Sequence, residues 1–240
     1  MRGIFYLKMA KKRNYHVIIT AAGSGSRYKN SSGTKPKQYL LLNGKPVILH
    51  SLLKFQKCSD IKSIYISAMP QFFSYLHSLA AKHKITKLKA MVEGGKTRFD
   101  SVKNAFNQIV AGLNDIILIH DAARPNLTKA DLDKIISESS KYGEVIPAVK
   151  IPETVKKVNK STVEKTIPRD DLWLVQTPQA FRYEVLSKAY ILAGERNDYT
   201  DEAAMAEHAG FTVRVSECSR SNMKITTQDD LELLKRLMKK

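Results

Sequence analysis

The sequence has few of the residues that mark a disulfide-stabilised or membrane-spanning protein. Among 240 residues only two cysteines occur, Cys58 and Cys218, and their positions show no metal-ligand spacing. We therefore expect two ordinary thiols in a reducing compartment, with a disulfide as the weaker alternative. No apolar run approaches the roughly 20 residues that a membrane helix needs. The 11 glycines and 8 prolines form no linker, which favours one domain over two.

Acidic side chains are also scarce, since 23 Asp and Glu residues face 40 Lys and Arg residues and leave a net charge of +17. Such a charge attracts polyanions, so a nucleic-acid-binding protein has to be considered. However, the basic residues are scattered, the longest basic run is residues 11–13, and no aromatic residues alternate with it. We expect a solvated basic surface whose field helps to collect phosphorylated substrates, with nucleic-acid binding as the weaker alternative.

The first residues do not form a recognisable targeting segment. Residues 4–7 are apolar, but Lys8 ends this stretch well before the length of a signal-peptide core. We expect residues 1–14 to form a flexible basic leader, with translation able to start at Met9. The protein is accordingly expected to be cytoplasmic and to have no membrane partner.

Short β-branched runs alternate with segments of helical spacing along the rest of the chain. The runs that predict buried strands are residues 17–19, 64–66, 116–119, 145–146 and 213–215. Apolar residues within 48–53 and within 99–109 share one helical face, residues 128–131 have the pattern of a capping box, and Thr227 is a candidate N-cap. This alternation predicts one α/β domain over residues 15–240, with a Rossmann-like, mostly parallel sheet and helices on both faces. Ligands of such sheets bind beyond the carboxyl ends of the strands.

Residues 150–167 break this pattern. Two short β-like stretches, 154–158 and 162–167, surround Asn159-Lys160-Ser161, and the segment has many charges but few large aliphatic side chains. We predict a hairpin arm that does not pack on the main sheet. The residues themselves leave two interpretations open, a solvated excursion or an arm that grips another subunit.

A loop of small residues follows the first predicted strand. Residues 21–27 read Ala-Ala-Gly-Ser-Gly-Ser-Arg, and two glycines leave backbone N–H groups open to phosphate oxygens. The loop lacks the Gly-Lys-Ser/Thr of a Walker A motif and the third glycine of a dinucleotide fingerprint, so alone it also fits a tight turn. With Lys-Pro-Lys-Gln-Tyr at residues 35–39, the combination resembles the signature loop of sugar nucleotidyltransferases. Arg27 and Lys37 suit the stabilisation of charge that develops when a nucleophile attacks the α-phosphorus of a nucleoside triphosphate.

A second glycine-containing segment, residues 93–102, ends another predicted strand. Arg98 and Ser101 fall in the first turns of the helix that follows, where N–H groups and a hydroxyl can meet polar ligand groups. A glycine turn with a solvated arginine is the alternative for this motif alone.

Residues 119–125, Ile-His-Asp-Ala-Ala-Arg-Pro, place an aspartate directly after a buried strand. Because a buried carboxylate needs a cation or a hydrogen-bond donor, Asp121 is a candidate for binding a nucleotide hydroxyl or for helping to place a magnesium ion. Arg124, three residues later, is a candidate for binding a second anionic group of the ligand. For His120 we expect packing or hydrogen bonding rather than the role of a base.

These motifs occur in an order that resembles the methylerythritol phosphate cytidylyltransferase family. The series Ala-Ala-Gly-x-Gly-x-Arg, Pro-Lys-Gln-Tyr, Gly-Gly-x-x-Arg-x-x-Ser-Val and His-Asp-Ala-Ala-Arg-Pro continues in residues 172–181, 200–203 and 222–226. The resemblance covers the chain from about His16 to its C-terminus. It implies an enzyme that converts CTP and 2-C-methyl-D-erythritol 4-phosphate to the CDP-alcohol and pyrophosphate, in the non-mevalonate route to isoprenoids. A ribitol-5-phosphate cytidylyltransferase is the nearest alternative, and Ala122-Ala123 after Asp121 favours the methylerythritol reading.

The resemblance also implies roles for individual residues. Arg27 and Lys37 match the catalytic cations. The implied nucleotide-binding residues are Ala21, Ala22, Gly23, Gly25, Gly95, Arg98, Ser101, Asp121 and Ala122. The implied acceptor-binding residues are Asp121, Arg124, Thr154, Thr177 and Lys224. Mg²⁺ is the expected cofactor, bound mainly through the CTP phosphates, with Asp121 as the one candidate protein ligand.

One departure from the family concerns the arm. The family often carries an arginine or another polar residue before an Asp-Thr pair there, whereas this chain has Pro152 before Glu153-Thr154. Proline supplies neither a charge nor a donor, and Lys150 or Lys156 is a candidate substitute without the geometry of an arginine. Because the arm of this family interlocks two subunits, the resemblance favours a homodimer formed through residues 150–167.

Overall fold

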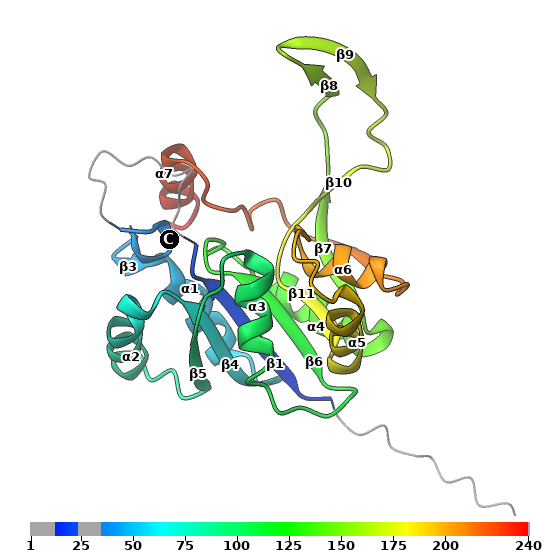
Figure 1. Cartoon of the computed structure of the whole chain (residues 1–240). Coiled ribbons are helices and arrows are strands. Elements are labelled where there is room, and N and C mark those ends of the chain that lie inside the picture. The colour runs from blue at the N-terminus through cyan, green and yellow to red at the C-terminus, as the bar shows by residue number, and fades with distance from the viewer. Residues whose placement is uncertain (1–12, 24–34, 240) are drawn as a thin grey trace, which may run out of the picture.

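The computed structural model describes residues 13–23 and 35–239, and they form a single α/β layer structure (Figure 1). The predicted leader falls mostly on residues 1–12, which lie outside the described part. The same holds for Gly25 and Arg27 of the glycine-containing loop. The structure therefore describes the fold and the positions of most predicted site residues, but not of these.

The centre of the molecule is an eight-stranded sheet. Its order is β10-β7-β11-β6-β1-β4-β5, and β12 also pairs with β7. Neighbouring strands run parallel from β6 through β1 and β4 to β5, whereas β10 and β11 run antiparallel to their neighbours. The mostly parallel sheet that the sequence predicts is therefore confirmed. The strands are β1 (Tyr15–Ala21), β4 (Ile61–Ala68), β5 (Leu88–Glu93), β6 (Ile116–Asp121), β7 (Val145–Lys150), β10 (Trp173–Val175), β11 (Gln179–Arg182) and β12 (Arg214–Glu217).

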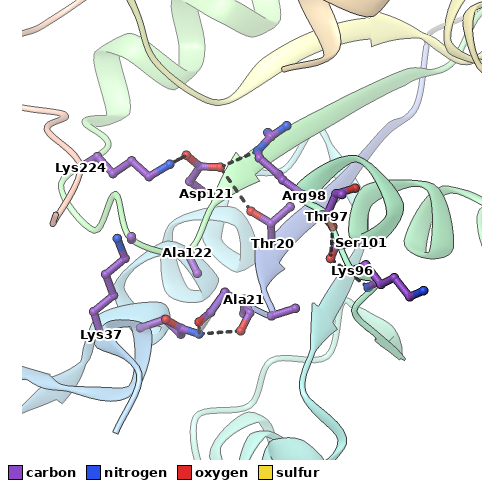
Figure 2. Close-up of a pocket in the computed structure, with 15 residues that line it drawn as sticks. Thr20, Ala21, Lys37, Lys96, Thr97, Arg98, Ser101, Asp121, Ala122 and Lys224 are labelled. Carbon is purple, nitrogen blue, oxygen red and sulfur yellow. Dashed lines mark hydrogen bonds and ion pairs between the residues drawn. The ribbon is translucent and has the colours of Figure 1, made fainter. Parts of the chain in front are cut away.

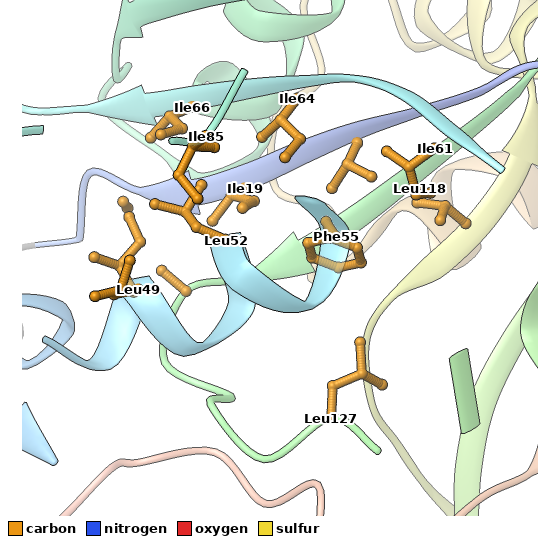
Figure 3. Packing of buried hydrophobic residues seen from close by; sticks show 14 of the residues in the cluster. Ile19, Leu49, Leu52, Phe55, Ile61, Ile64, Ile66, Ile85, Leu118 and Leu127 are labelled. Atoms are coloured by element: carbon orange, nitrogen blue, oxygen red, sulfur yellow. The ribbon is translucent and has the colours of Figure 1, made fainter. Parts of the chain in front are cut away.

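Helices cover both faces of this sheet, as predicted. Val17 and Ile19 of β1 pack with α1, α2 and α4, while the intervening Ile18 packs with α3, α5 and α6. This alternation follows from the two-residue period of a strand, and each fully buried aliphatic or aromatic side chain contributes roughly 1.5–3 kcal/mol. Figure 3 shows the first face, where Leu52 and Phe55 of α1 lie against the sheet. These helices are α1 (Val47–Lys57), α2 (Phe73–Lys82), α3 (Arg98–Phe106), α4 (Lys129–Tyr142), α5 (Tyr183–Ala193) and α6 (Glu202–His208).

The chain ends in α7 (Gln228–Leu237), which packs on a small separate cluster around β2 (Leu41–Leu42) and β3 (Lys45–Pro46). Two 3-10 turns complete the described elements, η1 (Lys37–Tyr39) and η2 (Pro70–Phe72). Within residues 13–23 and 35–239, no helix has both the length and the apolar composition required to cross a bilayer.

Threonine caps begin three of the helices. Thr227 forms a full capping box with Asp230 at α7, which confirms the predicted cap. At α4, Thr128 accepts from the backbone N–H of Asp131, which is one half of the capping box that the sequence predicts. Its hydroxyl also donates to the Asp131 carboxylate, whose other oxygen accepts from the Ser219 N–H. The carboxylate is thereby used for a tertiary contact that the local sequence does not indicate.

The predicted arm is present as a hairpin of β8 (Val155–Asn159) and β9 (Thr162–Ile167), which pair only with each other. Figure 1 shows it projecting from the body beyond the end of β7. Val158 and Val163 lie directly opposite each other in the hairpin and are 55% and 56% exposed. A two-stranded hairpin without other packing is only marginally stable in water.

Candidate active site

A cavity of about 480 Å³ lies at the carboxyl ends of β1 and β6. This is the edge of the sheet at which the parallel strands predict ligand binding. Residues from five separate segments of the chain line it, as Figure 2 shows for the labelled side chains. The predicted site residues on its wall are Ala21, Ala22, Gly23, Lys37, Gly95, Arg98, Ser101, Asp121, Ala122 and Lys224.

Asp121, the last residue of β6, is the electrostatic centre of the cavity. Its Oδ1 accepts from the Thr20 hydroxyl at 3.2 Å and from Arg98 Nε at 3.3 Å. Its Oδ2 accepts from Lys224 Nζ at 2.6 Å, and Arg124 Nε lies 3.9 Å away. Burial alone would favour the neutral acid, but these three cations hold the pKa of Asp121 well below its usual range. The expectation that this carboxylate meets a cation is confirmed.

Arg98 is fixed by a second carboxylate as well as by Asp121. Thr97 and Asp100 form a capping box that starts α3 immediately before this arginine. Nη1 of Arg98 donates to both carboxylate oxygens of Glu202, at 2.8 and 2.9 Å. Glu202 is almost fully buried, and its burial raises its pKa above the ordinary value. Arg98 is therefore held by the protein rather than loosely solvated.

The glycine turn before α3 depends on close backbone contact. A Cβ at Gly94 would lie 2.1 Å from the Cβ of Ala22, and a Cβ at Gly95 would lie 2.2 Å from the Cβ of Asp100. The Ser101 hydroxyl accepts from the Gly95 N–H at 3.0 Å, which draws the turn onto the first turn of the helix. Only glycine fits at these two positions without a backbone shift, and the turn consequently lies against the end of β1.

Gln38 connects the glycine-containing loop and the Lys-Pro-Lys-Gln-Tyr segment in space. Its Nε2 donates to the carbonyl oxygen of Ala21 at 2.7 Å and to that of Gly23 at 2.9 Å. The same 3-10 turn carries Lys37 to the cavity wall. Gln38 thus ties the start of the glycine-containing loop to the segment that carries the predicted catalytic lysine, whereas Arg27 lies outside the described residues.

Buried polar side chains next to Asp121 form a connected set of hydrogen bonds. Thr177 Oγ1 accepts from the Asp121 N–H at 3.0 Å and lies 3.1 Å from His120 Nδ1. His120 is completely buried, and this burial lowers its pKa to about 4. Its Nε2 lies 3.1 Å from the Ser51 hydroxyl and 3.2 Å from the Arg124 carbonyl oxygen. The expectation that His120 makes hydrogen bonds is confirmed, and its neutral ring belongs to the scaffold.

Three of the predicted acceptor-binding residues do not line this cavity. Thr177 is buried in the set of polar side chains just described, and Arg124 donates to the carbonyl oxygens of Asn222 and Val175. Thr154 is exposed near the base of the arm. Their contact with an acceptor stays a prediction.

Two contributors to the site escaped the sequence reasoning. Glu202 stands in a quoted motif, but nothing in the residues around it indicates burial against Arg98. Gln38 stands beside the predicted lysine, and its contact depends on a turn that brings two loops together. In both cases the partner is distant in sequence, so spacing alone carries no signal.

The described residues do not fit a metal held by the protein itself. Within residues 13–23 and 35–239, no three His, Cys, Asp or Glu side chains gather as a metal site. Both oxygens of Asp121 already accept hydrogen bonds from protein donors. A metal ligated by Asp121 would lie beside Arg98 and Lys224, whose positive charges oppose its binding.

Comparison with known proteins agrees with this geometry. The family model described as 2-C-methyl-D-erythritol 4-phosphate cytidylyltransferase matches residues 15–240. The enzyme of that name from Lysinibacillus sphaericus (strain C3-41) is 37% identical over 219 residues, covering 90% of this chain and 92% of the relative. The crystal structure of the Francisella tularensis enzyme of that name is 37% identical, with a TM-score of 0.76 over 92% of this chain and 97% of that chain.

A more distant likeness shows how much of the architecture is shared. The crystal structure of 4-diphosphocytidyl-2C-methyl-D-erythritol synthase from Anaerococcus prevotii is 26% identical, with a TM-score of 0.79 over 96% of this chain and 100% of that chain. The position of the cavity at the sheet edge, the cations on its wall and the family match over residues 15–240 lead to one assignment. The chain belongs to the 2-C-methyl-D-erythritol 4-phosphate cytidylyltransferase family.

Proposed function

We propose that this enzyme transfers the cytidylyl group of CTP to 2-C-methyl-D-erythritol 4-phosphate, giving 4-diphosphocytidyl-2-C-methyl-D-erythritol and pyrophosphate in non-mevalonate isoprenoid precursor biosynthesis. The observation that carries the proposal is the cavity of about 480 Å³ with Lys37, Arg98 and Lys224 on its wall. The family model that matches residues 15–240 of this chain is described by the same activity. The ribitol-5-phosphate alternative is not favoured by these relatives.

The reaction is an in-line displacement at the α-phosphorus of CTP. An oxygen of the acceptor's phosphate forms a bond to that phosphorus, and the bond from the phosphorus to the bridging oxygen of pyrophosphate breaks. Since the attacking oxygen is already anionic near neutral pH, no side chain has to remove a proton. The contribution of the protein is positioning and stabilisation of developing negative charge by cations held in place beforehand.

The cations of the cavity suit this task because they are fixed before substrate arrives. Asp121 holds Lys224 and Arg98 on the wall, and Lys37 lines the same cavity from η1. Little reorganisation is then needed when the charge on the phosphates develops. Arg27 takes part in this proposal on the strength of the sequence motif.

Magnesium enters the proposal with the nucleotide rather than with the protein. Triphosphate oxygens are preferred ligands of Mg²⁺, which commonly retains several waters and binds through substrate phosphates. This agrees with an Asp121 whose oxygens are occupied by protein donors.

A homodimer formed through the arm is also part of the proposal. The β8–β9 hairpin packs on none of the three described cores, and it carries the exposed pair Val158 and Val163. A second copy of the chain would cover this pair. A cytoplasmic location is proposed as well, supported by Cys58 and Cys218, which remain free thiols.

The test is pyrophosphate release from CTP and Mg²⁺ with either 2-C-methyl-D-erythritol 4-phosphate or ribitol 5-phosphate as the acceptor. We expect release with the first acceptor only. Lys37→Ala should lower kcat by a factor of about 100 or more, because a preorganised cation is lost from the transition state. Lys45→Ala removes an exposed lysine of β3 and is the matched control with normal turnover. Release with ribitol 5-phosphate alone, or with neither acceptor, would overturn the proposed substrate.

A further inference from the structure

Arg98 on the cavity wall forms an ion pair with Glu202, which is buried behind it. The Glu202 side chain is 3% exposed and that of Arg98 is 26% exposed. Both carboxylate oxygens of Glu202 accept from one nitrogen, Nη1 of Arg98. Removing a carboxylate from water is costly unless it is well paired, so a buried ion pair contributes little net stability. A pair at this position is therefore better explained by a role at the site than by packing.

The surrounding contacts fix the position of Glu202 closely. It is the first residue of α6, and the preceding Asp201 caps this helix by accepting from the Ala204 N–H at 3.0 Å. The other oxygen of Asp201 accepts from Gln179 Nε2 of β11 at 2.8 Å. The helix start is therefore anchored to the central sheet, and the carboxylate of Glu202 has a defined place.

As a result, the guanidinium group of Arg98 donates hydrogen bonds to two carboxylates. Nε donates to Asp121 Oδ1, while Nη1 points to Glu202. Two acceptors in different directions define the plane of the guanidinium group, which a single carboxylate would leave freer to turn. Because Arg98 contacts only Oδ1 of Asp121, the Oδ2 atom accepts from Lys224, another cation on the cavity wall.

We propose that Glu202 is a positioning residue of the reaction, which acts through Arg98 by holding its guanidinium group in the orientation that the bound nucleotide meets. Glu202 does not line the cavity, so its effect on the substrate is transmitted by the arginine. This inference rests on the proposed function, because it takes CTP as the ligand of the cavity.

The chain offers a matched control for a purely structural role. Glu144 is also buried and is held by Arg182, with contacts of 2.8 and 3.1 Å. Neither residue of this second pair lines the cavity. Removing its charge should therefore affect folding stability without affecting nucleotide binding.

The experiment compares Glu202→Gln, Glu144→Gln, Arg98→Ala and the double variant Glu202→Gln/Arg98→Ala by Tm, kcat and KM for CTP. Both glutamine variants should lower Tm. We expect only Glu202→Gln to raise KM for CTP, by about tenfold, while kcat changes less than threefold. The double variant should have the same KM as Arg98→Ala, since Glu202 has no route to the nucleotide once the arginine is gone.

The outcomes separate this inference from the proposed function. If Arg98→Ala raises KM but Glu202→Gln stays within twofold of the natural protein, the positioning role is wrong and the proposed function stands. An undiminished effect of Glu202→Gln in the Arg98→Ala background would also contradict it. If the natural protein releases no pyrophosphate, the proposed function itself fails. Should Glu202→Gln not fold, Glu202→Asp serves in its place, because it keeps the charge but withdraws the oxygens by one methylene group.

Discussion

Charged side chains of the candidate site neutralise one another in a connected group. Asp121 is shared by Arg98, Arg124 and Lys224, and Arg98 is shared in turn by Glu202. Breaking such a group by removing one partner leaves an uncompensated buried charge, which commonly costs about 3–5 kcal/mol. Single substitutions in this group are consequently expected to lower both stability and activity. The kinetic constants of each variant should therefore be compared together with its unfolding free energy.

His120 makes the stability of the protein depend on pH. Its pKa is about 4 in the folded state because burial disfavours the charged ring, and Arg124 adds to this effect while Asp121 opposes it. In the unfolded chain the ring titrates near pH 6.5. The stability contributed by His120 is therefore complete above about pH 6.5 and is lost progressively as the pH falls towards 4.

We predict that this linkage removes about 2 kcal/mol of unfolding free energy between about pH 8 and pH 5. His120→Asn keeps an acceptor near the Thr177 hydroxyl and should lose about 2 kcal/mol less over the same interval. Urea unfolding at several pH values measures the difference. His77→Asn at an exposed position is the control and should follow the natural protein. Equal pH slopes for His120→Asn and the natural protein would contradict the prediction.

At the scale of elements, the glycine turn determines how closely β5 and α3 approach the end of β1. Gly94 N–H donates to the Ala68 carbonyl oxygen of β4, and a Cβ at Gly94 would overlap that of Ala22 on the cavity wall. The approach of two backbone segments, rather than an unusual backbone angle, is what requires glycine at this position.

Gly94→Ala is predicted to lower the unfolding free energy by about 1–3 kcal/mol, because the turn has to move away from Ala22. The movement should also raise KM for CTP, since Ala22 lines the cavity. Denaturant unfolding and steady-state kinetics measure the two effects. Gly112→Ala is the matched control, because the nearest atom to its Cβ would lie at an ordinary 3.5 Å. Similar behaviour of the two variants would show that the close approach is unimportant.

The sequence predicts the elements with strong periodicity and misses those without it. Buried β-branched runs identify β1, β4, β6 and β7 because strands buried on both faces are apolar throughout. The antiparallel strands β10 and β11 are only three and four residues long, and they are not predicted as strands. Their pairing depends on neighbours such as β6 and β7 that are remote in sequence.

In the candidate site too, local sequence patterns predict some features, and contacts between remote residues determine the others. Asp121 and Gly95 are predictable because Asp121 ends β6 and Gly95 lies two residues after β5, at the ligand-binding edge of the sheet. The partition of Arg98 between Asp121 and Glu202 depends on where α6 begins, and that is set by the contact of Asp201 with Gln179. Local pattern therefore indicates which residues point to the edge, while tertiary contacts decide how they are paired.

At the scale of the whole molecule, the β8–β9 hairpin contributes no residue to the three buried clusters of the described chain. Lys157 and Glu164 form an ion pair within the hairpin, and exposed ion pairs of this kind are worth little. The opposed Val158 and Val163 are then the apolar surface that a second copy of the chain would bury.

We predict that the double variant Val158→Asp/Val163→Asp dissociates the proposed homodimer, because two carboxylates would have to be buried at the contact. Sedimentation velocity over a range of protein concentrations measures the change. Ile191→Asp alters a side chain of α5 that is 78% exposed on the body, and it should leave the association unchanged. A natural protein that sediments as a monomer, or a double variant that remains dimeric, would rule out the arm as the contact.

The long sequence separation across the site has a consequence for its biosynthesis. Arg98 and Arg124 are translated close to Asp121, but Lys224 follows Asp121 by 103 positions and Glu202 follows Arg98 by 104. At about 5–20 residues per second, the ribosome needs roughly 5–20 s to supply these last partners. The emerging chain therefore carries Asp121 with its arginines first, then Glu202, and finally Lys224. A nascent polypeptide that has already formed β6 still lacks the cation that completes the pocket, so the complete cavity wall becomes available only after Lys224 has been translated.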